Sequence, residues 1–163
     1  MLFEGNYNGY DFQLLATHLQ ADLEHSIRDK QCIEIKEHLL NKFNKKYIPQ
    51  FICGDFNIEM DDSHNYKRML KTLDAQNGDL TGNVQVTYDE INNDLAKIPN
   101  GKSKILDYVL IRNAERLINV ERKIQTFLTQ IGERKSFLSD HYAMEFSVNF
   151  GQHLEKHTAQ LSY

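Results

Sequence analysis

The stretch "FICGDFNIEM", residues 51–60, joins an apolar run to a group of polar residues. Three apolar residues open it, and Gly54 ends the run directly before Asp55 and Asn57. A short apolar run that ends in glycine is typical of a buried strand whose tip meets solvent. In α/β proteins, ligands bind at the carboxyl ends of strands. The stretch therefore predicts a buried strand that ends at the edge of a functional site.

The length and charge of the chain narrow its class. The 163 residues are enough for one domain with a real core. A net charge of -4 argues against a basic nucleic-acid footprint spread over the whole surface. A mildly acidic chain that handles phosphate would need a metal cation. Cys32 and Cys53 are expected to be core thiols rather than a disulfide.

Targeting signals are not apparent in the sequence. No apolar run reaches the roughly 18 residues that a membrane-spanning helix needs. The N-terminus also lacks the charged and then apolar layout of a signal peptide. The sequence therefore leaves the compartment open.

Strand and helix patterns alternate along the chain, which predicts a mixed α/β domain. We expect strands at residues 10–17, 51–54, 104–113, 117–128 and 140–150, and helices at 26–45 and 64–73. The polar region 74–104, rich in Asn, Gly and Asp, is too long for a plain connection and is a candidate functional loop.

Apolar periodicity predicts which faces of these elements are buried. The longer helix carries one apolar stripe, made of Cys32, Ile35, Leu39 and Phe43. One side of the 117–128 strand carries Val120, Ile124 and Leu128. One face of the last strand carries Tyr142, Met144, Phe146, Val148 and Phe150.

Four short motifs place catalytic residue types at the ends of strand-like segments. They are "ATHLQ" with His18, "GDFN" with Asp55 and Asn57, "LDY" with Asp107, and "SDH" with Asp140 and His141. A carboxylate inside an apolar strand, as at Asp107, needs a partner, and a histidine is a natural one. Together the motifs supply oxygen ligands for a hard cation, a base for water and an acid for a leaving group. That set suits the hydrolysis of a phosphodiester.

In order and spacing, these motifs resemble the later motifs of the endonuclease/exonuclease/phosphatase superfamily, the deoxyribonuclease-like hydrolases. The run "GNVQVTYDEINNDLAKIPNGKSKILDYV", residues 82–109, is most similar to the bacterial-type neutral sphingomyelinases. The resemblance covers about residues 6–149. It implies that residues 1–150 form the C-terminal part of such a domain, with residues 151–163 as a polar tail. The implied fold is an α/β (α+β) sandwich with four layers, of which this chain supplies roughly the C-terminal half.

The resemblance also implies a role for each motif in a Mg²⁺-dependent phosphodiesterase. Asp55 and Asn57 would orient the nucleophile and the phosphate close to the metal, with Asp140 nearby. His141 would be the general base or the donor to the phosphorane, and Asp107 would hold its ring in one tautomer. His18 would act on the leaving-group side.

The sphingomyelinase branch implies release of phosphocholine from sphingomyelin at a membrane surface. Within the Asn-rich stretch, Tyr88, Asn92 and Asn93 are expected either to border the headgroup or to belong to a purely structural loop. The segment before "SDH" carries the aromatics Phe127 and Phe137 and the cations Arg134 and Lys135, and it is expected to be an exposed turn between two strands with weak membrane insertion.

The family's N-terminal half normally supplies an Asn and the main metal-binding Glu. This chain begins just before the "THLQ" strand, and Glu4 lies too near that strand to replace the missing Glu. We expect the chain to need that half as a partner. Loss of one hard carboxylate ligand weakens cation binding by at least about tenfold, so little catalysis is expected without it.

Two other functions stay open. A nuclease or phosphoinositide-type phosphatase of the same superfamily would need a basic groove, whereas the basic residues here are dispersed. A catalytically incomplete fragment, or a domain that only binds a partner, is the third possibility.

Overall fold

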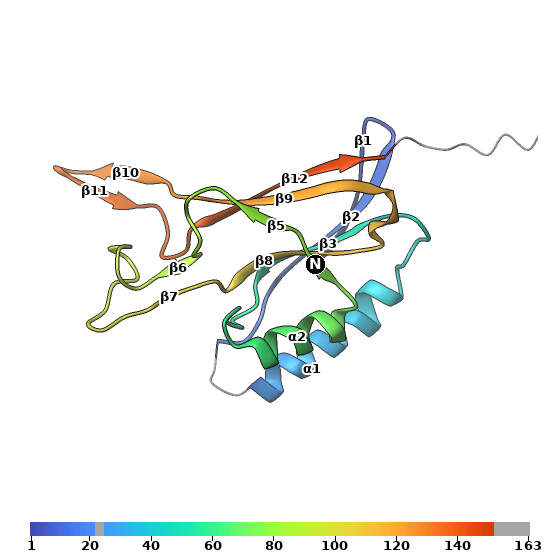
Figure 1. The fold of residues 1–163 in the computed structure, drawn as a ribbon, viewed down its shortest axis with the longest axis horizontal. Coiled ribbons are helices and arrows are strands. Elements are labelled where there is room, and N and C mark those ends of the chain that lie inside the picture. Colours follow the sequence, from blue (N-terminus) through green and yellow to red (C-terminus); the bar gives the residue numbers. More distant parts are fainter. Residues whose placement is uncertain (22–24, 152–163) are drawn as a thin grey trace, which may run out of the picture.

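The computed structural model describes residues 1–21 and 25–151. A twisted five-stranded sheet lies between a pair of helices on one side and a smaller sheet on the other (Figure 1). The strand order in the larger sheet is β1-β2-β3-β8-β4. Its strands are β1 Leu2–Tyr7, β2 Tyr10–His18, β3 Gln50–Asp55, β8 Asp107–Arg112 and β4 Gln76–Asn77. β2 and β3 run parallel and the other neighbours are antiparallel.

The smaller sheet has the order β12-β9-β5, and two short pairs of strands complete the set. Its members are β5 Asp79–Thr81, β9 Leu117–Gln125 and β12 Ala143–Phe150. The short pairs are β6 Tyr88–Asp89 with β7 Ser103–Lys104, and β10 Leu128–Ile131 with β11 Arg134–Phe137. The β10–β11 hairpin projects from one end of the molecule (Figure 1).

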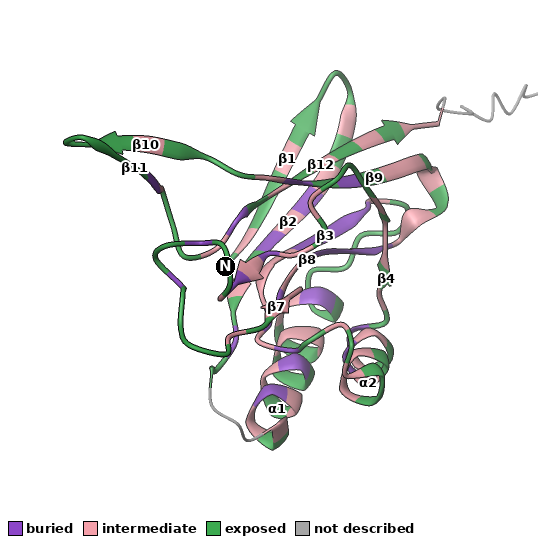
Figure 2. Cartoon of the chain, turned by 60° about the vertical axis from the view of Figure 1, so that its left-hand side comes forward, coloured by how far each residue is buried: buried purple, intermediate pink, exposed green. Residues whose placement is uncertain are grey.

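Two helices cover the outer face of the larger sheet and lie side by side (Figure 1). Helix α1 spans His25–Ile35 and continues as the π-helical turn η1, Lys36–Asn41. Helix α2 spans Ser63–Leu73, and the short 3-10 turn η2 spans Ala114–Arg116. The main core lies between these helices and the sheet, where the buried residues in Figure 2 gather. It is built from Leu15, Leu19, Cys32, Leu40, Ile52, Phe56, Ile58, Met69, Leu73, Tyr108 and Leu110.

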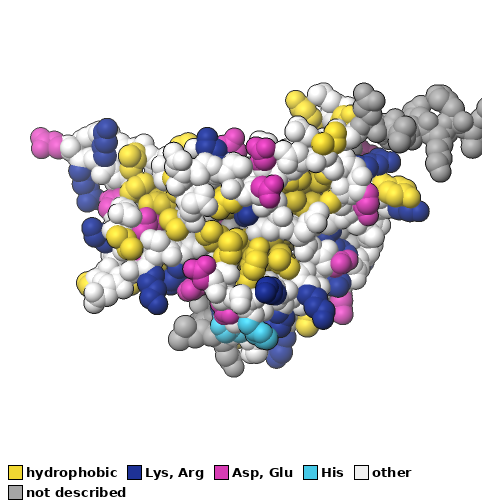
Figure 3. All heavy atoms as spheres, in the orientation of Figure 1, with side chains coloured by type: hydrophobic (Ala, Val, Ile, Leu, Met, Phe, Trp, Pro, Cys, Tyr) yellow, Lys and Arg dark blue, Asp and Glu magenta, His cyan; other side chains and the backbone are white. Residues whose placement is uncertain are grey.

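The two sheets meet through aromatic rings. The ring centroids of Phe51 and Phe146 are 5.3 Å apart, and those of Tyr10 and Phe150 are 4.8 Å apart. Along β12, half-buried and exposed residues alternate, as the period-two pattern of the sequence predicted. This contact is less complete than the one under the helices, and hydrophobic side chains stay visible across the middle of the face in Figure 3. Such a surface favours association with another protein layer.

The structure corrects two sequence predictions. The helix expected at residues 26–45 ends at Asn41, so Phe43 lies beyond it and is exposed. The last part of the helix, η1, is a π-helical turn, and its wider winding places Leu40 in the core. Leu128 does not continue the buried side of β9 with Ile124. It lies in the projecting hairpin and is exposed.

The two cysteines form no disulfide. Both are free, and Cys32 is fully buried whereas Cys53 is partly buried. Burial raises the pKa of both thiols to about 12, so they stay protonated at neutral pH.

All but the first residue of the expected polar tail lies outside the described residues. Within the described ranges, no helix is long and apolar enough to span a bilayer.

Candidate active site

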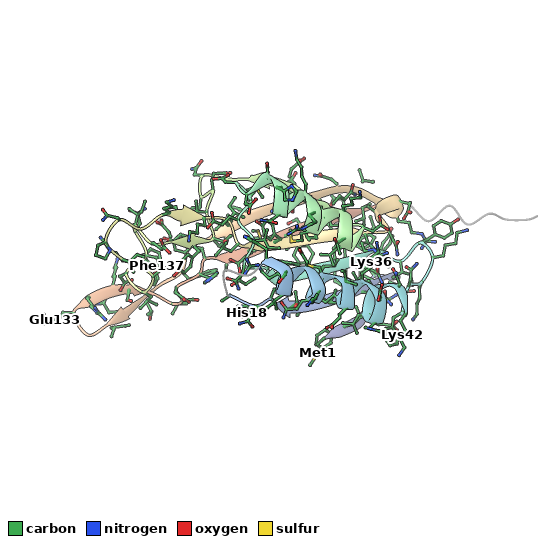
Figure 4. All side chains as sticks on the ribbon, turned by 90° about the horizontal axis from the view of Figure 1, so that it is seen from below. Met1, His18, Lys36, Lys42, Glu133 and Phe137 are labelled. Carbon is green, nitrogen blue, oxygen red and sulfur yellow. The ribbon has the colours of Figure 1, made fainter. Side chains whose placement is uncertain are left out.

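Three of the predicted site residues form one row across the larger sheet. In the strand register, His18 on β2 pairs with Asp55 on β3, and Asp55 pairs with Asp107 on β8. The row lies at the carboxyl ends of the two parallel strands, where the core gives way to solvent. Figure 4 shows His18 between Glu133, at the hairpin tip, and Lys42, at the end of η1. The topology therefore gathers residues from three separate motifs at one edge.

His141 joins this row from the loop before β12. Its Nδ1 lies 2.8 Å from Oδ2 of Asp107, and its Nε2 lies 3.8 Å from Oδ2 of Asp55. On the other side of Asp55, the same oxygen is 3.4 Å from Nε2 of His18. The side chains of His141, Asp107 and Asp55 are 25%, 19% and 12% exposed, whereas that of His18 is 71% exposed. Asp55 therefore lies between a partly buried histidine, His141, and an exposed one, His18.

The surroundings of His141 and of Asp55 raise the pKa of both groups. The hydrogen bond with Asp107 raises the pKa of His141 above its ordinary value, and nearby Asp55 and Asp140 contribute to the same shift. Burial raises the pKa of Asp55, although the backbone hydrogen bond from Asn57 opposes the change. Both groups thus hold protons more tightly than free side chains do, which suits a site for proton transfer.

Asn57 shapes the turn after β3. Its backbone N–H donates to Oδ1 of Asp55 over 2.8 Å, and its φ of 51° is in the left-handed region that asparagine tolerates. Its side-chain amide donates to the carbonyl of Leu19 over 2.9 Å. The turn thereby orients Asp55 and ties β3 to the chain that follows His18.

The site offers carboxylate ligands for a cation. Among the described residues, Asp55, Asp107 and His141 offer ligand atoms within 4.8 Å of one another. Carboxylate oxygens suit Mg²⁺, whereas an imidazole nitrogen suits softer metals, so Asp55 and Asp107 fit Mg²⁺ better than His141 does. Asp140 is exposed, outside this group, and accepts a hydrogen bond from Oγ of Ser139. Two carboxylates fit a magnesium ion that keeps several waters or takes a further ligand from elsewhere.

The three residues expected at the headgroup lie in different places. The ring centroid of Tyr88 is 4.8 Å from that of His141, so Tyr88 borders the site. Asn92 is exposed, and its side-chain amide donates to Asp89. Asn93 is fully buried, and its amide faces the protein behind the site rather than the mouth.

Sequence reasoning missed the role of Thr87. Its hydroxyl oxygen accepts hydrogen bonds from the backbone N–H groups of Leu106 and Asp107, at 3.0 and 3.2 Å. A threonine within a polar loop gives no periodic signal, so only its place in "TYD", residues 87–89 of the run that resembles the sphingomyelinases, could have marked it. Glu4, in contrast, pairs with Lys45, which agrees with its exclusion from the metal ligands.

A pocket of about 350 Å³ adjoins His141. Its other walls are mostly apolar and come from the end of the hairpin and the start of β12: Phe127, Phe137, Leu138, Ser139, Tyr142 and Ala143. The hairpin itself is the exposed turn between two strands that the sequence predicted, with Arg134 and Lys135 exposed on it. A polar catalytic group thus adjoins an apolar pocket.

The raised pKa of His141 predicts how stability depends on pH. Because the folded-state pKa lies above the ordinary 6.5, the His141–Asp107 pair stabilises the fold fully below that value. The contribution is lost as pH rises through the folded-state pKa. We expect the free energy of unfolding to fall over this window in the parent, and to fall less in Asp107→Asn, where Asp55 and Asp140 still face the imidazole. Urea unfolding in EDTA at several pH values measures this, and parallel curves for the two proteins would contradict it.

A scan against protein-family models and a search of curated proteins found no match. A search of solved structures found beta toxin from Staphylococcus aureus, with a TM-score of 0.77 and 24% identity over 90% of this chain and 55% of that chain. A variant of beta toxin has been solved with bound magnesium ions. Sphingomyelinase C from Streptomyces griseocarneus gives a TM-score of 0.70 at 22% identity, covering 89% of this chain and 55% of the other. An endonuclease/exonuclease/phosphatase family protein from Leptotrichia buccalis gives 0.60 at 19%, covering 91% and 53%.

These likenesses confirm the predicted fold class. The chain has the mixed α/β sandwich of the bacterial sphingomyelinases and of the endonuclease/exonuclease/phosphatase proteins, and it spans about half the length of the solved structures that it matches. That share agrees with a C-terminal half.

Proposed function

We propose that this chain, which has the fold of about half of a deoxyribonuclease-like sandwich, carries catalytic residues of a metal-dependent phosphodiesterase. The observation that carries the proposal is the convergence of His18, Asp55, Asp107 and His141. These residues come from four separate segments, and each lies within hydrogen-bonding or ion-pairing distance of another. Phosphodiester hydrolysis needs a base for water, an acid for the leaving group and carboxylates for a cation.

The geometry supports a division of roles. Nδ1 of His141 bonds to Asp107, which leaves Nε2 as the working atom toward Asp55. Nε2 would take a proton from the attacking water or donate to the phosphorane. His18, the exposed histidine across Asp55, would protonate the leaving group. Asp55 and Asn57 would orient water and phosphate, and Asp140 would lie near the metal.

Magnesium is the proposed cofactor. The carboxylates of Asp55 and Asp107 would hold it, with further ligands from Asp140, from Asn57 or from an N-terminal half that supplies an Asn and a Glu. When bound, the ion would neutralise charge that develops on the phosphoryl oxygens. We propose that this N-terminal half is a partner required for full activity, and that it also covers hydrophobic surface left open in Figure 3.

The proposed substrate is sphingomyelin, with release of phosphocholine. The apolar pocket next to His141 supports a substrate with an apolar part beside its phosphodiester. Tyr88 and Asn92 would border the headgroup from the other side of the histidine. The sphingomyelinase C among the similar structures supports the same choice. A nucleic-acid substrate would call for a basic groove instead.

One comparison tests the proposal. The full-length form with the N-terminal half is incubated with sphingomyelin vesicles, and phosphocholine release is measured with Mg²⁺ and with EDTA. We expect release only with Mg²⁺, and at least about tenfold less from residues 1–163 alone. Release that persists in EDTA would remove the metal-dependent mechanism. Equal hydrolysis of plasmid DNA would favour the nuclease, and inactivity toward every phosphodiester would favour a binding domain.

A further inference from the structure

We propose that residues 87–94, which include strand β6, are a positioning element that sets the geometry between Asp107 and His141. The inference rests on the proposed function, which gives Asp107 and His141 the central role in proton transfer. It concerns two buried side chains, those of Thr87 and Asn93, which belong neither to the proposed headgroup site nor to the proposed metal ligands. The element holds both partners of the pair from the protein side, and Thr87 and Asn93 are its two principal positioning residues.

Thr87 connects the two sides of the pair. Its side chain is fully buried, and its hydroxyl oxygen accepts from the N–H groups of Leu106 and Asp107. Its backbone carbonyl accepts from the N–H of Tyr142 over 2.7 Å. One residue therefore fixes the backbone of Asp107 and the residue directly after His141.

Asn93 holds the chain on the other side of His141. Its Nδ2 donates to the carbonyls of Ser139 and Asp140, at 2.9 and 3.0 Å, and its Oδ1 accepts from the N–H of Leu95 at 3.0 Å. The side chain is fully buried, so these bonds are made away from water and are expensive to break. His141 is thereby held between the Asn93 contacts before it and the Thr87 contact after it.

Two further contacts join the element to the same loop. Tyr88 forms an isolated β-bridge with His141, and its ring lies against the imidazole. The hydroxyl of Tyr142 donates to Oδ2 of Asp89 over 3.3 Å. Asp107 and His141 are 34 residues apart in the chain, so their 2.8 Å contact depends on such supports. A proton-transfer pair needs its geometry held to within about half an ångström.

The test compares Thr87→Val with Thr87→Ser in the ¹⁵N-labelled chain. Valine keeps the shape of threonine but leaves two backbone N–H groups without their acceptor, whereas serine keeps the hydroxyl. The readout is the imidazole ¹⁵N spectrum of His141, assigned by its absence in His141→Ala. In the parent and in Thr87→Ser, we expect neutral His141 to carry its proton on Nδ1, with a slowly exchanging Nδ1–H signal. In Thr87→Val, we expect loss of that signal and a mixture of both tautomers.

Asn93→Ala gives a second, independent variant with the same expected loss. Backbone amide spectra show whether each variant is folded. A folded Thr87→Val or Asn93→Ala with the parent's His141 signals would overturn the proposal. Failure of both variants to fold would also overturn it, because it would show a general requirement for folding rather than a role at the site.

The measurement needs no substrate, so its result does not depend on phosphodiesterase activity. Activity that fails in the parent while the Nδ1–H signal responds as expected would count against the proposed function alone. In an active full-length form, the same variants should lower kcat by about 10-fold to 100-fold. KM should stay unchanged, because neither residue faces the pocket.

Discussion

His141→Ala is expected to lower phosphodiester hydrolysis by about a thousandfold in the full-length form. The imidazole is the only group in the described part of the site that combines a hydrogen bond to Asp107 with a free ring nitrogen directed toward Asp55. Its removal takes away the base or donor and leaves Asp107 without its partner. Phosphocholine release from sphingomyelin vesicles with saturating Mg²⁺ measures the effect.

His38→Ala is the matched control for this prediction. His38 is an exposed histidine on η1, within the helix layer on the outer side of the sheet, so its loss should leave the rate unchanged. Equal rates for His141→Ala and the parent would refute the role of His141. Equal losses in both variants would point to a general effect on stability instead.

Gly54→Ala is expected to destabilise the fold by about 4 kcal/mol and to disrupt the site with it. Gly54 has a φ of 142°, and a Cβ on it would lie 1.8 Å from the carbonyl oxygen of Thr17. That oxygen belongs to the backbone of the neighbouring strand β2, so it cannot rotate away as a flexible side chain could. β3 would have to move away from β2, which would separate Asp55 from His18. Urea unfolding followed by circular dichroism measures the loss.

Gly132→Ala separates the steric clash from backbone strain. Gly132, in the hairpin turn, also has a positive φ, 61°, but a Cβ there would meet nothing within 4 Å. It should cost only about 1 kcal/mol. Similar losses for the two variants would show that strain alone, and not the close approach of β2 and β3, explains the requirement at Gly54.

The strands and the core faces could largely be predicted from the sequence. The alternation from Met144 to Phe150 predicted β12, and the apolar run before Gly54 predicted β3. These patterns are local, because the side-chain period of a strand depends only on its own backbone. The expectation that Asp107 needs a histidine partner also came from a local fact, the cost of a carboxylate in an apolar strand. That the histidine partner of Asp107 is His141 was implied only by the family resemblance.

Other features could not be predicted locally. The π-helical turn changed which residue of the first helix enters the core, so Leu40 is buried where the periodic pattern pointed to Phe43. Asn93 looked like its neighbour Asn92 in an Asn-rich stretch, yet one is buried and the other exposed. Composition cannot separate two such residues, because their hydrogen-bond partners lie far away in the chain.

The sequence by itself determined the strands, the residue types at their ends and the polar character of the loop between them. Only the tertiary structure decided that His18, Asp55 and Asp107 share one row, that His141 closes it, and that Thr87 and Asn93 support it from behind. The physical reason is the range of the interactions. Hydrophobic periodicity acts over a few neighbouring residues, whereas a hydrogen bond between side chains 34 residues apart forms only after strand register has brought them together.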